Sequence, residues 1–195
     1  MDQPSAQSPI SKPDKIVAID LELNQLNGNP KIIEIGISVG DIKTRQILET
    51  KRFFVNPEEE ITEYINKLTG ITQAMVANAP TISGAYDEVK VYLSQFNYRK
   101  QLVEWGNGDV YKLRGELMKV GRGIDDDWIF GWATMNVKGV AQAIKDAKGI
   151  SLQSGLAKSM NFFGIRFIGV KHQAGDDAEN TLRLYFELLR RLGQV

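Results

Sequence analysis

Residues 16–22, Ile-Val-Ala-Ile-Asp-Leu-Glu, decide how the rest of the chain is interpreted. Four apolar residues in a row, mostly β-branched, predict a strand that is buried on both faces near the centre of a sheet. The strand ends in two carboxylates, Asp20 and Glu22, whose side chains point to the same face. Because neighbouring carboxylates repel, one must keep its proton or a cation must lie between them. Oxygen ligands suit Mg²⁺ or Mn²⁺, although acids at a strand end can also simply face solvent.

The composition is that of a soluble globular protein. With 195 residues, 43% apolar and 25% charged, the chain is long enough for one substantial core. We expect a single domain over residues 15–195, after a disordered tail over residues 1–14 that is rich in Pro, Ser and Gln. The chain has neither the features of a signal peptide nor an apolar run long enough for a membrane helix. We therefore expect a cytoplasmic protein without a membrane partner.

Charge and cysteine content exclude several classes of function. Lys plus Arg and Asp plus Glu both number 24, so no overall positive charge indicates a nucleic-acid partner, and any such contact must be local. The absence of cysteine excludes disulfides, thiol catalysis and cysteine-based zinc sites.

The spacing of apolar residues predicts an α/β fold. Residues 31–39 and 46–55 read as two further strands, and short turns connect them to each other and to the first strand, which gives an antiparallel meander. Later in the chain helical spacing alternates with short apolar runs, so we expect a mixed β-sheet flanked by helices. The expected later strands cover residues 101–105 and 128–135, and the expected helices cover residues 62–68, 81–96, 136–147, 152–163 and 176–192, with another that starts at residue 109.

Three further polar residues are candidates for a site with Asp20 and Glu22. Asp109 follows a strand and a Gly-rich turn and starts a helix, where an acid often serves only as the N-cap. Asp177 lies in the first turn of the last helix, where the helix dipole favours an acid. His172, the single histidine, lies five residues before Asp177, and a glycine between them allows both to face one cavity.

Together these residues form a pattern that resembles the DEDDh superfamily of 3′–5′ exonucleases, which includes RNase T and the proofreading exonucleases of DNA polymerases. The resemblance extends from Ile16 to about Leu192. Two segments resemble the branch that contains KapD and the histone-mRNA 3′-exonucleases: Phe163-Gly164-Ile165, and the stretch from His172 to Thr181, HQAGDDAENT, which is the most specific signal. The fold that this resemblance implies is ribonuclease H-like.

The resemblance also implies a mechanism. Two Mg²⁺ or Mn²⁺ ions would be held by Asp20, Glu22, Asp109 and Asp177, with Asp20 bridging both ions. His172 would be the general base. The implied substrate is the 3′ end of single-stranded RNA or DNA, RNA more than DNA, and the product is a nucleoside 5′-monophosphate.

The sequence departs from the family pattern at two positions. Gly108 replaces a bulky aromatic residue that can stack on a terminal base, so that stacking is lost or moved to another residue. Leu23 follows Glu22 where small residues or Thr are common, and it either contacts the terminal nucleotide of the substrate or packs in the core. Basic residues near Asp109 either follow a phosphate backbone or form a solvated surface: Arg99, Lys100, Lys112, Arg114, Lys119 and Arg122.

Two alternatives compete with a catalytic exonuclease. An exonuclease-like domain can serve as a non-catalytic module that binds nucleic acid or acts as a scaffold, although all five polar positions are intact. The stretch 36–40, Gly-Ile-Ser-Val-Gly, also matches the G-x-S-x-G motif of serine hydrolases. That motif requires a helix directly after the serine, whereas Ser38 lies in an alternating strand pattern, so we interpret the match as accidental.

Overall fold

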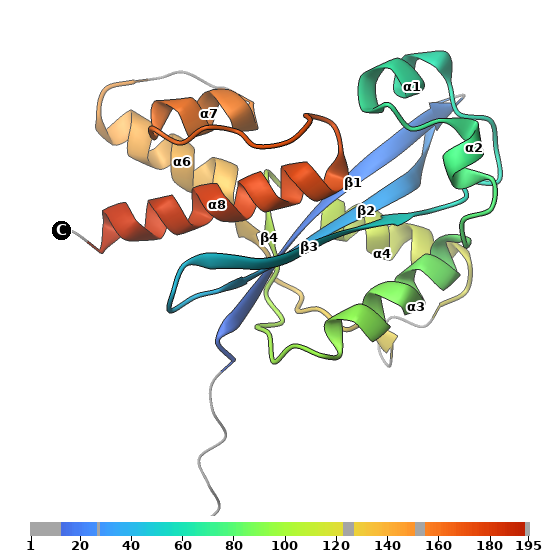
Figure 1. Cartoon of the computed structure of the whole chain (residues 1–195), viewed down its shortest axis with the longest axis horizontal. Coiled ribbons are helices and arrows are strands. Elements are labelled where there is room, and N and C mark those ends of the chain that lie inside the picture. The colour runs from blue at the N-terminus through green and yellow to red at the C-terminus, as the bar shows by residue number, and fades with distance from the viewer. Residues whose placement is uncertain (1–12, 27, 123–126, 151–154, 194–195) are drawn as a thin grey trace, which may run out of the picture.

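The fold is built on a mixed sheet with helices on both faces (Figure 1). The computed structural model describes residues 13–26, 28–122, 127–150 and 155–193. Within these ranges the sheet has five strands in the order β3-β2-β1-β4-β5. The first three strands pair antiparallel, and β4 and β5 run parallel to β1. This confirms the expected α/β class and meander. The strands are β1 (Lys15–Leu26), β2 (Asn29–Asp41), β3 (Gln46–Phe54), β4 (Val103–Glu104) and β5 (Met135–Asn136).

Strand β1 is buried on both faces, as its sequence predicts. Val17 and Ile19 pack into the core beneath helices α3 (Ile82–Leu93) and α4 (Asp109–Lys119). Ile16 and Ala18 pack on the opposite side with helices α6 (Val137–Ala147), α7 (Leu156–Phe162) and α8 (Ala174–Leu192). Because side chains alternate along a strand, Asp20 and Glu22 share the face of Ile16 and Ala18 and point toward α8.

Two short helices follow the meander. Helix α1 (Glu63–Thr69) begins after Thr62, whose side chain accepts a hydrogen bond from the Ile65 amide at 3.3 Å, and ends at Gly70 in the left-handed conformation. Helix α2 (Gln73–Val76) was not expected from the sequence. Over the described residues no helix is both long and apolar enough to cross a membrane.

The expected strand over residues 128–135 is wrong. Only Met135, at its end, pairs in β5, and the preceding segment is irregular. Its aromatic side chains pack around Tyr86, with Trp128 stacked at 6.0 Å and Phe130 edge-on at 6.4 Å between ring centroids. The Tyr86 hydroxyl accepts a hydrogen bond from the Ile129 amide at 3.0 Å, so this backbone group is satisfied without a neighbouring strand.

Other expectations agree with the structure or lie outside it. Helix α7 replaces the expected helix over 152–163, and residues 151–154 lie outside the described residues. Residues 1–12 of the expected tail also lie outside them, and the division into a tail and one domain stays a prediction. Helix α8 starts two residues earlier than expected, at Ala174.

The glycines of the G-x-S-x-G match serve the packing of α8 on β2. A Cβ atom on Gly36 would lie 2.0 Å from the Ala174 carbonyl carbon, and one on Gly40 would lie 2.7 Å from the Phe186 ring. Ser38 between them is fully buried, and its hydroxyl lies 3.0 Å from that of Thr50. The motif therefore brings the start of α8 close to the sheet and does not form a nucleophile turn.

Candidate active site

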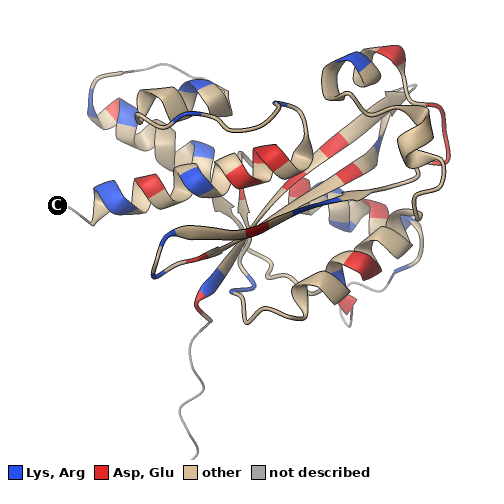
Figure 2. Cartoon of the chain, viewed as in Figure 1, with Lys and Arg blue, Asp and Glu red and all other residues tan. Residues whose placement is uncertain are grey.

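The carboxyl half of β1 and the start of α8 enclose a pocket of about 460 Å³, which we call the acidic pocket. Four of the five polar residues predicted from the sequence line it: Asp20 and Glu22 from β1, His172 from the preceding loop, and Asp177 from α8. Figure 2 shows the acidic positions of β1 and of the first turns of α8 in the same region. The remaining walls are both apolar and basic and include Trp105, Leu156, Lys158, Phe167 and Lys171.

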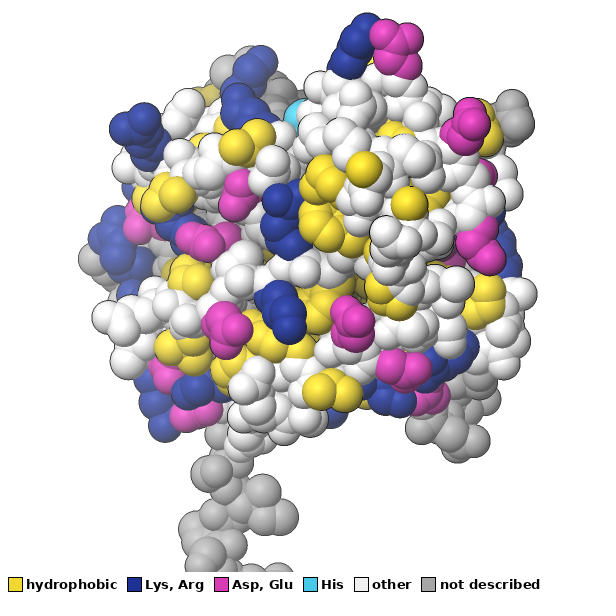
Figure 3. Space-filling model, turned by 45° about the vertical axis from the view of Figure 1, so that its right-hand side comes forward, with side chains coloured by type: hydrophobic (Ala, Val, Ile, Leu, Met, Phe, Trp, Pro, Cys, Tyr) yellow, Lys and Arg dark blue, Asp and Glu magenta, His cyan; other side chains and the backbone are white. Residues whose placement is uncertain are grey.

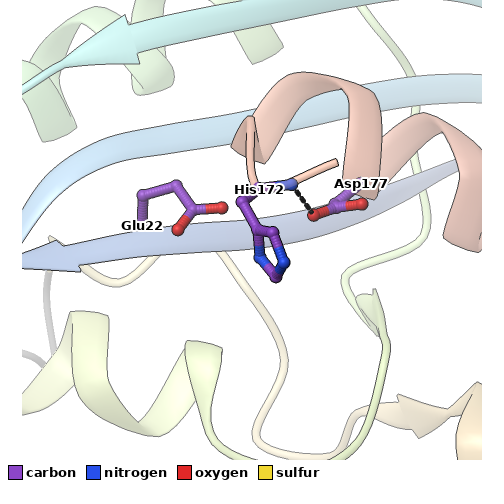
Figure 4. A group of neighbouring side chains, drawn as sticks. All are labelled: Glu22, His172 and Asp177. Atoms are coloured by element: carbon purple, nitrogen blue, oxygen red, sulfur yellow. Dashed lines mark hydrogen bonds between the residues drawn. The ribbon is translucent and has the colours of Figure 1, made fainter. Parts of the chain in front are cut away.

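Three of these side chains form a compact group of possible metal ligands. One ligand atom from each of Glu22, His172 and Asp177 lies within 4.8 Å of the other two. In Figure 4 the Glu22 carboxylate points toward His172 and Asp177. The His172 amide donates a hydrogen bond of 2.9 Å to the Asp177 carboxylate, which fixes the loop relative to α8. This loop is tightly turned, since His172 has a φ of 62°.

The fifth residue, Asp109, lies close enough for its charge to raise the pKa of both Asp20 and Glu22. Asp109 is the first residue of α4, and the N-cap is Gly108. Asp109 therefore does not have the capping role that its position also suggested. Instead Glu104, which is 2% exposed, accepts hydrogen bonds from the amides of residues 108, 109 and 110 at 3.1–3.4 Å. Asp109 is not part of the lining of the acidic pocket, and among the described residues no hydrogen bond engages its side chain.

Burial and neighbouring charges raise the pKa values of the acids in the site. Burial, followed by the charges of Asp109 and Asp177, raises the pKa of Asp20 well above its usual value. Burial and the charge of Asp177 also raise the pKa of Glu22, to about 8. The pKa of Asp177 rises through burial, and the hydrogen bond from the His172 amide opposes this rise. In this arrangement the metal-free pocket disfavours full ionisation, and a bound cation would restore it.

Asp109 belongs to the same group of acids, because its charge raises the pKa of Asp20. Burial and the charge of Glu104 raise its pKa to about 6, while Lys112 lowers it. The four acids thus combine oxygen donors with an unfavourable excess of negative charge. This is the environment that a hard divalent cation requires, so the residues fit the metal ions that the sequence predicts.

The loop before α8 is tied to that helix by side chains that the sequence did not single out. Asp176 accepts a hydrogen bond from the Val170 amide at 2.7 Å. Asn180 is fully buried and bonds both the amide and the carbonyl of Ile168, at 3.0 and 2.7 Å. These contacts hold the segment that carries His172 over the pocket.

A second buried acid, Glu34, supports the start of α8 from β2. It lies opposite Glu22 in the β1–β2 register and is fully buried. Its carboxylate accepts hydrogen bonds from Arg52 and from the Ala174 amide, and Arg52 also donates to Gln173, the N-cap of α8, at 3.0 Å. The sequence contained a signal for Glu34, namely a single acid within the apolar alternation of residues 31–39.

Leu23 does not line the acidic pocket. It packs partly in the core and borders a neighbouring hollow with Tyr111, Lys112 and Lys119. Its contact with substrate therefore stays a prediction.

One of the basic residues expected near Asp109, Arg122, neither is free to bind phosphate nor is simply solvated. Arg122 lies in a set of ion pairs that we call the ion-pair cluster, formed by Asp87, Lys90, Arg122 and Asp127. Over the face drawn in Figure 3, basic and acidic side chains are intermixed, and the histidine (cyan) reaches the surface.

Comparison with known proteins places this geometry in context. Residues 17–185 match the family described as Exonuclease (RNase T). The DNA polymerase III PolC-type of Caldanaerobacter subterraneus subsp. tengcongensis is 30% identical over 193 residues, which cover 98% of this chain and 13% of that protein. The 3′-5′ exonuclease DinG of Bacillus subtilis is 27% identical over 183 residues, covering 93% of this chain and 18% of that protein. The chain thus spans less than a fifth of the length of these curated relatives.

Solved structures share the fold. A 3′-exonuclease studied for 3′-end specific recognition of the histone mRNA stem-loop superposes with a TM-score of 0.79 at 23% identity, over 93% of this chain and 84% of that one. The nuclease domain of 3′hExo, a DEDDh family member bound to rAMP, superposes with a TM-score of 0.75 at 23% identity, over 93% and 94% of the two chains. These likenesses confirm the ribonuclease H-like fold.

Proposed function

Because the chain belongs to the RNase T exonuclease family, we propose that it is a metal-dependent 3′–5′ exonuclease that releases nucleoside 5′-monophosphates from single-stranded nucleic acid. One observation carries the proposal: Asp20, Glu22 and Asp177 line one pocket with His172, and the charge of Asp109 raises the pKa of Asp20, although β1, α4 and α8 are far apart in the sequence. A purely structural role would not require negative charges to be concentrated at a partly buried position.

The residues that would hold two Mg²⁺ or Mn²⁺ ions are Asp20, Glu22, Asp109 and Asp177. Burial, together with the charges of Asp109 and Asp177, raises the pKa of Asp20 and Glu22, and this supports the assignment because a divalent cation would favour their ionised forms. When bound, such ions lower the pKa of a water molecule and neutralise charge on the phosphate and the leaving oxygen.

The other residues of the pocket handle protons, charge and water. His172 is proposed to accept the proton of the attacking water, a role that typically contributes about 10²–10⁴-fold to the rate. It is well placed for this role because it is exposed at the pocket and its backbone is fixed by Asp177. Lys158 and Lys171 attract the phosphodiester to the pocket, and the apolar side chains of Leu156 and Phe167 limit the access of water.

We further propose that RNA is preferred over DNA. The support comes from the solved relatives, one studied with a histone mRNA stem-loop and one bound to rAMP. This preference is a finer proposal than the exonuclease activity itself, and the two can fail separately.

A panel of end-labelled oligonucleotides tests the proposed activity. Single-stranded RNA and DNA of matched sequence, each with a free or a phosphorylated 3′ end, are incubated with Mg²⁺ or with EDTA. We expect a ladder that shortens from the free 3′ end, faster on RNA, and no products in EDTA. Internal cuts or activity that survives EDTA would contradict the mechanism. Binding without hydrolysis under all metal conditions would support the non-catalytic module instead.

A further inference from the structure

Two exposed aromatic side chains lie near the start of α4, with an arginine between them. Tyr111 on α4 is 72% exposed, and Trp132 in the loop before β5 is 67% exposed. The Arg114 guanidinium lies 5.7 Å from the Tyr111 ring centroid and 5.0 Å from that of Trp132. Large aromatic residues are usually well buried, so a pair of exposed rings that share one cation is an unusual surface.

The exposure of Trp132 does not result from a loosely held loop. The residue before it, Gly131, donates a backbone hydrogen bond of 2.6 Å to the Lys100 carbonyl. Two residues after it, the Thr134 hydroxyl donates a 2.6 Å hydrogen bond to Glu104. Trp132 is thus presented to solvent from a segment that is fixed to the β4 region on both sides.

The aromatic residues border a hollow of about 370 Å³ at the start of α4. Its lining includes Gly108 and Val110, the two neighbours of Asp109. Tyr111 lines this hollow and also the adjacent one that contains Leu23. A continuous surface therefore leads from the end of β1, past Tyr111, to Trp132.

The charge of this surface is also distinctive. Within the described part of the chain, no carboxylate forms an ion pair with Arg114, in contrast to Arg122. Glu104 borders the hollow, but its carboxylate is occupied by the amides of α4 and by Thr134. The hollow therefore offers two ring faces and an unneutralised cation, which match the flat bases and the negative backbone of a single-stranded nucleic acid.

We propose that Tyr111, Arg114 and Trp132 form a stacking site for a base of the single-stranded substrate upstream of its 3′-terminal nucleotide. The site rests on the proposed exonuclease function and extends it, since it lies outside the acidic pocket. Trp132 and Tyr111 provide the stacking faces, and Arg114 contacts the adjacent phosphate. The stacking site also lies close to Gly108, the position where the aromatic side chain of the family pattern is absent.

Substrate length separates this site from the catalytic pocket. The p-nitrophenyl ester of thymidine 5′-monophosphate needs only the catalytic pocket, whereas a single-stranded oligonucleotide also reaches the stacking site. We expect Trp132→Ala to raise KM for the oligonucleotide by about five- to 150-fold, the range of alanine effects on base stacking, and to leave ester hydrolysis unchanged. Trp132→Phe retains a ring and should restore most of the affinity.

Met118→Ala provides the matched control, because Met118 is also exposed on α4 but borders neither hollow. It should behave as wild type on both substrates. An unchanged KM for the oligonucleotide in Trp132→Ala would overturn the stacking site, and so would an equal loss on both substrates.

A binding measurement keeps the stacking site testable if the proposed activity fails. Quenching of tryptophan fluorescence by the oligonucleotide is measured in EDTA, where hydrolysis is absent. We expect the quenching to fall in Trp132→Phe, and equal quenching in both proteins would overturn the site. A wild-type protein that hydrolyses neither substrate would reject the exonuclease function alone.

Discussion

The ion-pair cluster beside α3 and the acidic pocket beside α8 contain the same kind of side chain in opposite surroundings. In the ion-pair cluster, hydrogen bonds from Arg122 lower the pKa of Asp87, and Lys90 and Arg122 outweigh the effect of burial and lower the pKa of Asp127. In the acidic pocket, burial and neighbouring acids raise the pKa of Asp20 and Glu22. In the ion-pair cluster each carboxylate pairs with Lys90 or Arg122, whereas in the acidic pocket Asp20 and Glu22 have other acids as neighbours.

This difference indicates that the two groups have different roles. The ion-pair cluster satisfies its charges within the folded chain and joins α3 to the segment after α4. The acidic pocket is electrostatically incomplete without an added cation, although Arg52 offsets part of the charge near Glu22. Such incompleteness is costly for a structural site and useful for one that binds metal ions and a phosphodiester.

The largest expected effect contrasts one aspartate from each group. Asp20→Asn removes a carboxylate that is proposed to hold the metal ions, so we expect kcat to fall by about 10³-fold or more. Asp127→Asn should leave kcat unchanged and lower the free energy of unfolding by about 1 kcal/mol, as the loss of a partly exposed ion pair does. Steady-state hydrolysis and urea unfolding measure the two effects. Similar activity losses in both variants would remove the distinction.

A second, smaller effect is the response of stability to metal ions. Mg²⁺ that binds only the folded chain adds about 2.7 kcal/mol at 100 times its Kd, which raises Tm by about 5–10 °C for a chain of this size. We expect this gain in the wild type and in Asp127→Asn, and its loss in Asp20→Asn, by thermal denaturation monitored with circular dichroism. An undiminished gain in Asp20→Asn would place the cation elsewhere.

The smallest expected effect is a difference in pH dependence, measured in EDTA. The pKa of Glu22 is raised by folding to about 8, so the folded state binds more protons and its stability should fall as pH rises from about 5 to 8. Glu22→Gln should flatten this slope. The pKa of Asp127 is lowered, so its contribution is present above its usual pKa and is lost as the solution becomes more acidic. If Glu22→Gln has the same dependence of stability on pH as the wild type, Glu22 is not the group that causes this dependence.

The sequence predicted the meander because its signals are local. Unbroken β-branched residues in β1 and alternation in β2 depend only on which faces are buried, and Gly70 marks the end of α1 through its backbone conformation. The apolar run in residues 128–135 was wrongly predicted to be a strand. Its side chains Trp128 and Phe130 pack around Tyr86 although their backbone is irregular. Periodicity alone does not distinguish these two origins of apolar character.

The polar residues of the site were predictable only where a known motif contains them. The acids and His172 were predicted as a set, whereas Glu34 and Glu104 were not singled out although both are almost fully buried. Their functions depend on contacts across the fold, Glu34 with the start of α8 and Glu104 with the start of α4. A single buried acid in an apolar strand was the available signal, but its partners become visible only in three dimensions.

The contact between Gly36 and Ala174 has a consequence for how the proposed active site can change in evolution. At this point main-chain atoms of β2 and α8 meet without a side chain between them, close to where Asp177 faces Glu22. The distance between β2 and α8 is therefore set by main-chain atoms, which remain when neighbouring side chains are substituted. In the proposed exonuclease, walls such as Leu156 and Phe167 could therefore diverge toward new substrates while the acids keep their spacing.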